Sequence, residues 1–167
     1  YHRIMKFFFV LLLFCSKQLF AQDIILSSII ILDNNIPKEC GINILINDNE
    51  DKFNLKVSIK KTDSGTSTFF SSESKTQRIK TSDIHTFNNQ IFKIINLKNR
   101  NDQKIIVENK TDQDLTSNFF QELLIGGAKI YVNKKTYDLN GPIDSKVRLE
   151  YLFCTGEMFL PNYKNNE

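Results

Sequence analysis

Apolar and polar residues alternate through most of this chain, and the alternation limits what the chain can fold into. The clearest stretch is LKVSIKK at residues 55–61, in which every second residue from Leu55 to Ile59 is apolar. A period of two places these side chains on one face of a β-strand and the lysines on the other face. Because helical periodicity is nearly absent after residue 22, we expect an all-β fold.

Strand patterns recur at the spacing that is typical of an antiparallel sandwich. Clusters of Asn, Asp and Ser separate them, roughly every 8–12 residues. We expect residues 22–39 to form an N-terminal strand and linker, and residues 40–118 to form an immunoglobulin-like antiparallel β-sandwich. The predicted strands are 23–32, 41–47, 55–61, 66–71, 77–81, 90–97 and 104–108.

Residues 119–167 are predicted to form a C-terminal extension. Its first segment, 119–125, fits either a strand or a short helix. The sequence DLNGP at residues 138–142 is a strong turn signal. We therefore expect residues 129–137 and 147–154 to pair as a β-hairpin around it.

Residues 1–21 have the features of a cleaved export signal, with residues 1–4 as an upstream extension. Lys6 precedes an unbroken apolar run at residues 7–14, and Ala21 is the small residue expected before the cleavage site. A membrane-spanning helix needs about 20 apolar residues, so the run is too short for an anchor. We expect a periplasmic or extracellular protein with no integral membrane segment.

The charge of the chain argues against one class of partner. Lys and Arg total 22, and Asp and Glu total 19. Signal cleavage removes Arg3, Lys6 and Lys17 but no acidic residue, so the mature chain is formally neutral. Proteins that bind nucleic acids usually carry a net basic domain or patch, so we expect no nucleic-acid partner.

Two cysteines, Cys40 and Cys154, remain after signal cleavage. An even pair in an exported protein usually forms a disulfide, and this one would join the first strand-rich block to the last predicted strand. Two separate buried thiols are the alternative. The chain has no CxxC motif, which argues against a thiol-exchange enzyme.

The sequence offers little that resembles a catalytic or metal site. His85 is the only histidine after the signal, and neither an activated nucleophile nor a zinc-ligand spacing accompanies it. The acidic stretch NDNED at residues 47–51 suggests calcium, but it lacks the glycine and distal glutamate of an EF-hand loop, and a solvated hairpin turn is the alternative. We expect a non-enzymatic protein with no catalytic residue, metal or cofactor.

Four basic residues suggest a surface that binds a partner. Lys56 and Lys60 are four residues apart on one predicted strand, so they share a face. Arg78 and Lys80 are two apart on another predicted strand and share a face for the same reason. If both strands lie in one sheet, the four cations can attract an anionic or polar extended partner. An ordinary solvated face with lysines that protect the edge is the alternative.

The order of segments resembles that of the periplasmic curli-assembly inhibitors, which are small exported immunoglobulin-like sandwiches. LKVSIKK is followed by DSGTST, FKIINL, KNRNDQ and KIIVEN, and Ser64, Gly65 and Ser67 match the Ser-Gly-x-Ser element that joins two strands in that family. We expect Gly65 to supply the positive φ or tight bend of this turn. The resemblance covers residues 40–118. It implies chaperone-like contact with amyloid subunits through the four cations, and the C-terminal extension departs from the family pattern.

Together these features predict a non-enzymatic exported module that binds other exported proteins, with curli-type amyloid subunits as candidate partners. The alternative is a structural or surface-adhesion β-module. In that case the isoleucine-rich strand at residues 23–32 would pair with a neighbouring chain.

Overall fold

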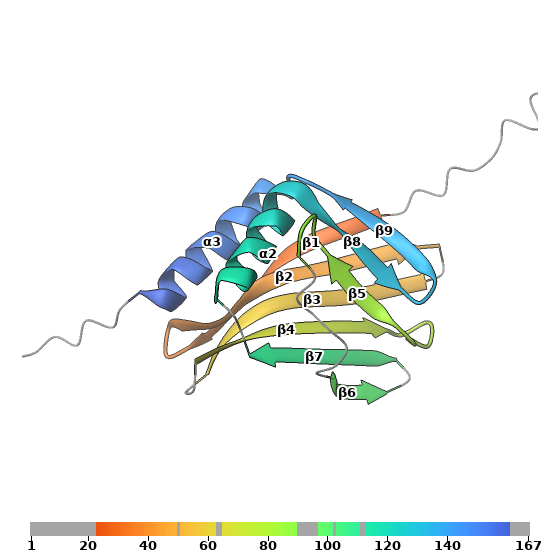
Figure 1. Cartoon of the computed structure of the whole chain (residues 1–167), viewed down its shortest axis with the longest axis horizontal. Coiled ribbons are helices and arrows are strands. Elements are labelled where there is room, and N and C mark those ends of the chain that lie inside the picture. The colour runs from red at the N-terminus through yellow and green to blue at the C-terminus, as the bar shows by residue number, and fades with distance from the viewer. Residues whose placement is uncertain are drawn as a thin grey trace, which may run out of the picture.

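The computed structural model describes residues 23–49, 51–62, 65–89, 97–101, 103–110 and 113–160, so the predicted export signal lies outside the described residues. These residues form two layers, a six-stranded sheet and, over one of its faces, a three-stranded sheet with two helices (Figure 1). In spatial order the larger sheet contains β1 (Asp23–Asp33), β2 (Ile36–Asp48), β3 (Asp51–Thr62), β4 (Gly65–Ser74), β7 (Lys104–Lys110) and β6 (Leu97–Asn101). The second layer contains β5 (Ser82–His85), β8 (Gly127–Val132) and β9 (Lys135–Asn140), together with α2 (Gln113–Gly126) and α3 (Ser145–Phe159). The predicted all-β fold, with antiparallel sheets packed in two layers, is confirmed.

The larger sheet follows the alternation seen in the sequence. Leu55 of β3 lies opposite Ile44 of β2, and Val57 lies opposite Phe70 of β4. All four side chains are fully buried, because they face the second layer. β1 to β4 are joined in chain order as a meander, in contrast to the Greek-key connections of immunoglobulin domains. Gly65 has a φ of 128°, as the turn between β3 and β4 was predicted to require.

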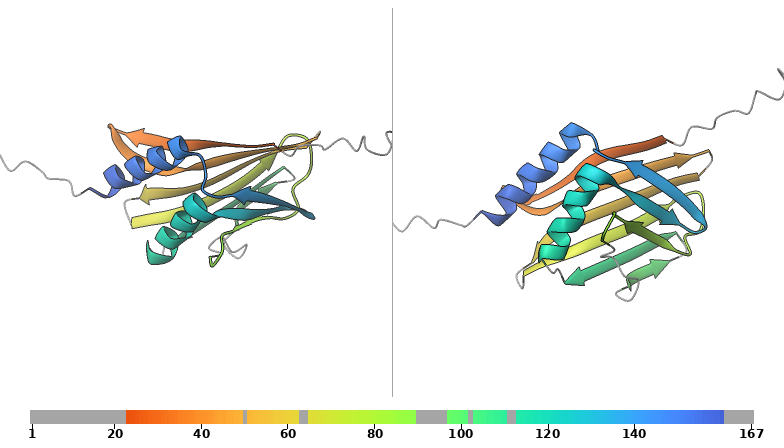
Figure 2. Two further views of the ribbon diagram at one scale, coloured as in Figure 1. Left: turned by 90° about the horizontal axis from the view of Figure 1, so that it is seen from above. Right: turned by 45° about the horizontal axis from the view of Figure 1, so that its top comes forward.

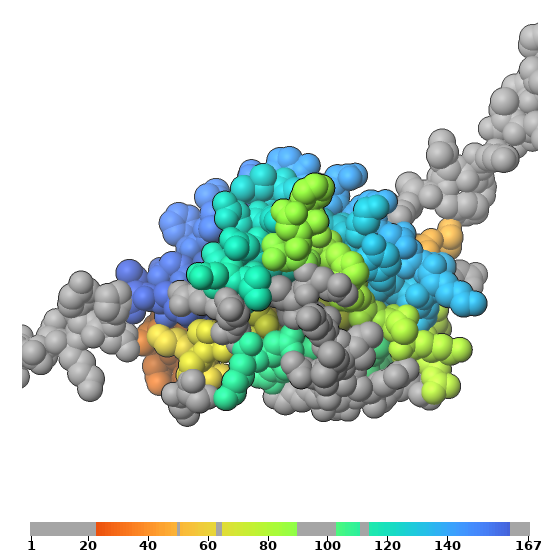
Figure 3. Space-filling model, in the orientation of Figure 1, coloured from red at the N-terminus to blue at the C-terminus, as the bar shows by residue number. Residues whose placement is uncertain are grey.

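The second layer covers one face of the larger sheet. Seen from above, the helices and the smaller sheet lie on the same side of it (Figure 2). In the space-filling view, side chains of α2, β5, β8 and β9 cover the middle of this face (Figure 3). Apolar residues from both layers meet in a single core, which includes Ile42, Phe53, Phe119, Leu123, Ile130, Val132, Tyr151 and Met158.

The predicted hairpin between residues 129–137 and 147–154 is wrong, because its second strand is part of α3. The buried residues of α3 are Val147, Tyr151, Cys154 and Met158, whose spacing of three and four residues is helical. β8 pairs instead with β9, through a turn at Asn133 that has a φ of 57°.

The elements of the structure differ from the sequence prediction at three other places. Residues 77–81 form a loop, because the backbone N–H groups of Lys80 and Thr81 donate to the side chain of Asn133 and not to a neighbouring strand. The polar segment KNRNDQ lies between two predicted strands, but its first residues belong to β6. The boundary predicted after residue 118 falls inside α2, so the C-terminal residues share elements with the sandwich.

Two further differences concern single strands. β5 was not predicted, because its four residues are too few to show a periodicity. The predicted strand 90–97 lies outside the described residues except for Leu97, which begins β6.

The predicted disulfide between Cys40 and Cys154 is confirmed. Their Cα atoms are 5.8 Å apart, and the bond closes a sequence separation of 114 residues. It joins β2 to α3 and not, as expected, to a C-terminal strand. The bond therefore links the two layers of the fold.

Candidate functional site

The four predicted cations do not share one surface. Lys56 and Lys60 lie on the outer face of β3, as predicted, opposite the face that the second layer covers. The Lys60 Nζ is 3.4 Å from the Glu39 carboxylate and 3.7 Å from the centre of the Phe69 ring. Arg78 and Lys80 lie instead in the loop that follows β4. Lys60 lies beside the first residues of β4, opposite Ser67, whereas this loop begins after the last residue of β4, at its other end.

The loop that carries Arg78 and Lys80 is attached to the smaller sheet. The Asn133 side chain accepts a hydrogen bond from the Lys80 backbone N–H at 2.7 Å and donates one to the Arg78 carbonyl at 3.0 Å. On the outer face of the larger sheet, Lys104 pairs with Glu73 at 3.3 Å. This face therefore carries charges of both signs and not a cluster of cations.

The acidic turn at residues 47–51 contacts a lysine. The Lys135 ammonium lies 2.7 Å from the Asp48 carboxylate and 3.0 Å from that of Asp51, and the Tyr137 hydroxyl donates to Asp48 at 3.0 Å. The hydrogen bond from Lys135 holds the pKa of Asp48 below its usual value, and burial raises the pKa of Tyr137. Among the described residues, no group of three or more His, Cys, Asp or Glu side chains could hold a metal ion.

His85 is paired within its own strand. Its Nε2 lies 2.7 Å from the Asp83 carboxylate, and its ring centre is 4.8 Å from that of Tyr131. The neighbouring hydroxyl, on Thr86, donates to the Glu122 carboxylate at 2.7 Å. These contacts connect β5 to β8 and α2, so they hold elements of the second layer together.

β1 forms an edge of the larger sheet. Within the residues that the structure describes, its backbone pairs only with β2, from Asp23 opposite Asn47 to Asp33 opposite Ile36. Between its terminal aspartates, β1 contains only Ile, Leu and Ser. Edge strands are usually protected by lysine, proline or a bulge, because their free N–H and C=O groups can pair with another chain. The one irregularity in the pairing of β1 falls between Ile31 and Leu32, so most of the strand lacks such protection.

Large apolar side chains of β1 are exposed. Ile25 and Ile31 point to the outer face and are 48% and 50% exposed, respectively. On the inner face, Ser28 donates a hydrogen bond to Glu150 of α3. α3 therefore packs against the inner face of β1, and no other strand in the described part of the chain pairs with its free side.

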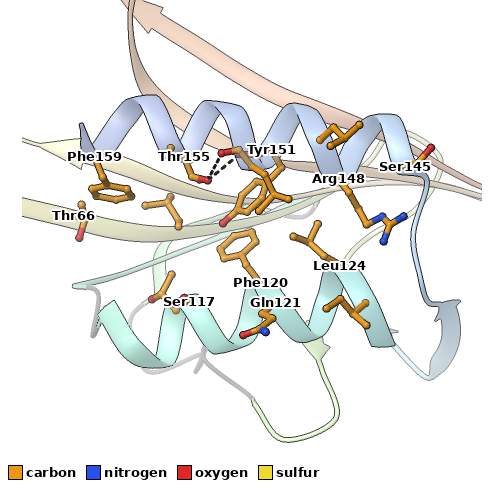
Figure 4. Close-up of a pocket in the computed structure, with 16 residues that line it drawn as sticks. Thr66, Ser117, Phe120, Gln121, Leu124, Ser145, Arg148, Tyr151, Thr155 and Phe159 are labelled. Atoms are coloured by element: carbon orange, nitrogen blue, oxygen red, sulfur yellow. Dashed lines mark hydrogen bonds between the residues drawn. The ribbon is translucent and has the colours of Figure 1, made fainter. Parts of the chain in front are cut away.

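A groove of about 890 Å³ lies between α2 and α3 (Figure 4). Its α2 wall includes Phe120 and Leu124, its α3 wall includes Leu152 and Phe159, and Ile59 of β3 lines it as well. The Phe120 and Tyr151 rings stack with their centres 4.8 Å apart. We call this cavity the interhelical groove.

One charged side chain lines the interhelical groove. Figure 4 shows Arg148 extending from α3 toward α2, near Leu124 and Ser145. The Arg148 Nε is buried and has no hydrogen-bond partner, and its guanidinium makes no ion pair within the described residues. The sequence prediction missed this site, although the helical spacing from Val147 to Met158 after Asp144, a favourable N-cap residue, is a signal that could have indicated α3.

Comparisons with protein-family models, with curated proteins and with solved structures found no match to this chain. Neither of the two helices in the described residues is long and apolar enough to cross a membrane.

Proposed function

We propose that this protein is an exported, non-enzymatic module that binds other exported proteins by pairing β1 with an extended segment of the partner. The observation that carries the proposal is the free edge of β1, with which no strand of the described residues pairs. This edge is eleven residues long and has no charge between Asp23 and Asp33. A free strand of this kind can bind a partner by β-augmentation, in which backbone hydrogen bonds supply much of the affinity. The disulfide supports export, because such bonds persist in oxidising compartments.

Curli-type amyloid subunits are the partners that we propose. A growing fibril end exposes a strand edge, to which the next subunit adds through its backbone. The second edge of β1 is occupied by β2 along the whole strand. A fibril end that pairs with β1 therefore finds no free side of β1 for the next subunit, and growth at that end stops.

An amyloid-growth assay with curli-type subunits tests this proposal. We expect substoichiometric wild-type protein to lengthen the lag phase, and we expect the double variant Ile25→Lys/Ile31→Lys to lose this effect. Lysines on an edge strand disfavour pairing with another chain, and both positions are exposed enough to accept them. Phe87→Lys is the matched control, because Phe87 is 93% exposed in the loop after β5 and is not part of β1.

The proposal fails if wild-type protein leaves the lag phase unchanged. It also fails if the double lysine variant delays growth as well as the Phe87→Lys control does.

A structural β-module that pairs with its own copies is the second candidate. The absence of charge within β1 favours it, because two antiparallel copies of the strand can pair without opposing like charges along most of their length. Sedimentation of the mature protein separates the two candidates. A dimer that the double lysine variant converts to monomer would favour self-pairing, and a monomeric wild type would exclude it.

A further inference from the structure

We propose that the interhelical groove binds a single-chain alkyl carboxylate, that is, a fatty acid, with its carboxylate on Arg148. This site is independent of β1, and its occupant differs from the strand partner proposed above. The inference depends on the shape of the groove, on its apolar walls and on the unpaired guanidinium.

The dimensions of the groove fit a chain-like ligand. Arg148 and Phe159 both line it and are eleven residues apart on α3, a distance of about 16 Å at the rise of an α-helix. The volume of about 890 Å³ lies within the range of small-molecule sites, roughly 300–1,000 Å³. An extended alkyl chain can therefore lie along α3 with its head at Arg148 and its tail toward Phe159.

The walls favour an alkyl chain over a peptide. Leu149, Leu152 and Phe159 are each about half exposed, so a ligand would remove apolar surface from water. The Thr155 hydroxyl, which also lines the groove, already donates to the carbonyls of Tyr151 and Leu152. A peptide would bring backbone N–H and C=O groups that need partners along the groove. An alkyl chain has no such groups beyond its head.

Arg148 favours an anionic head group because the nearby acidic side chains already have partners. Glu150 accepts from Ser28 and lies 3.8 Å from Lys146, and Asp144 accepts from the first backbone N–H groups of α3. On α2, Glu122 accepts from Thr86 and Asn88. A planar guanidinium can bind a carboxylate through two parallel hydrogen bonds, so a fatty-acid head can pair with the partly exposed guanidinium of Arg148.

Displacement of Nile red, a neutral apolar dye, by dodecanoate and dodecanol tests this inference in the full mature protein. We expect wild-type protein to bind dodecanoate more tightly than dodecanol. Arg148→Gln should weaken the binding of dodecanoate by about ten- to a hundredfold, which is the range expected for a lost hydrogen bond to a charged group. The same variant should leave the affinity for dodecanol unchanged. Arg148→Lys should retain part of the preference for dodecanoate over dodecanol.

A second variant tests the location of the chain. Gly156 lines the groove, and a Cβ built on it would meet no atom within 4 Å, so Gly156→Phe can fill the groove without a clash in the backbone. We expect this variant to weaken the binding of dodecanoate and dodecanol alike, and we expect its circular dichroism spectrum to match that of the wild type.

Two results would overturn the inference. The first is failure of dodecanoate to displace the dye, and the second is equal binding of dodecanoate to wild type and Arg148→Gln. If an amphipathic helical peptide displaces the dye where dodecanoate fails, the occupant is a protein helix.

Discussion

At the scale of single residues, side-chain hydrogen bonds attach the loops to the second layer. Glu122 of α2 accepts from the Thr86 hydroxyl at 2.7 Å and from the Asn88 backbone and side chain at 2.9 and 2.7 Å. These donors, with Thr86 contributing most, lower the pKa of Glu122 to about 2 from its usual 4.5. One carboxylate thus holds the loop after β5 against α2.

This hydrogen bonding predicts a specific dependence on pH. Because the pKa of Glu122 is lower in the folded chain, its stabilising effect is complete above about pH 4.5 and is lost as the pH falls toward 2. We expect Glu122→Gln to lower the free energy of unfolding at pH 6, and we expect the difference from wild type to shrink between pH 4.5 and 3. Urea titrations at each pH measure this.

Glu157→Gln is the matched control for Glu122. Glu157 is exposed on α3, and its side chain makes no hydrogen bond within the described part of the chain. A loss for Glu122→Gln that stayed constant with pH, or that equalled the loss for the control, would contradict the assigned role.

At the scale of secondary-structure elements, α3 contributes the most residues to the features described above. It carries Arg148, Cys154 and one wall of the interhelical groove. Alternation did not predict it, because its buried residues recur at helical spacing among exposed apolar ones such as Leu152 and Phe153. By contrast, β2 to β4 and β7 follow the predicted strands, because each buries one face against a single layer, and β1 coincides with the predicted isoleucine-rich strand.

The N-cap of α3 gives a prediction at this scale. The Asp144 carboxylate accepts from the backbone N–H groups of Lys146 and Val147 at 2.9 and 3.1 Å. We expect Asp144→Ala to lower the free energy of unfolding by about 1 kcal/mol, because these N–H groups lose their partner. Asp144→Ser should retain most of the stability, since serine is also a good N-cap. Equal losses for the two variants, measured by urea denaturation, would argue against capping.

At the scale of the whole molecule, the two layers are joined at separate places. The disulfide links β2 to α3, and Lys135 of β9 binds the two aspartates of the turn between β2 and β3. The Phe53 and Tyr137 rings, from opposite layers, also meet with their centres 5.8 Å apart. These contacts hold the second layer over the larger sheet.

The disulfide provides the prediction for the whole molecule. A bond that closes a loop this long typically contributes about 2–5 kcal/mol, chiefly by restricting the unfolded chain. We expect Cys40→Ala/Cys154→Ala to lose stability in that range under oxidising conditions. Wild-type protein in a reducing agent should match the variant, and a wild-type stability that reduction left unchanged would contradict the prediction.

Five of the six strands of the larger sheet, all except β6, and the pairing of the cysteines could be inferred from the order of residues. Alternation is a local signal, and Cys40 and Cys154 are the two cysteines that lie outside the predicted export signal. The open edge of β1, the interhelical groove and the separation of Arg78 and Lys80 from Lys56 and Lys60 required the tertiary structure. Each of them depends on which distant segments pack together, and a local pattern does not specify those contacts.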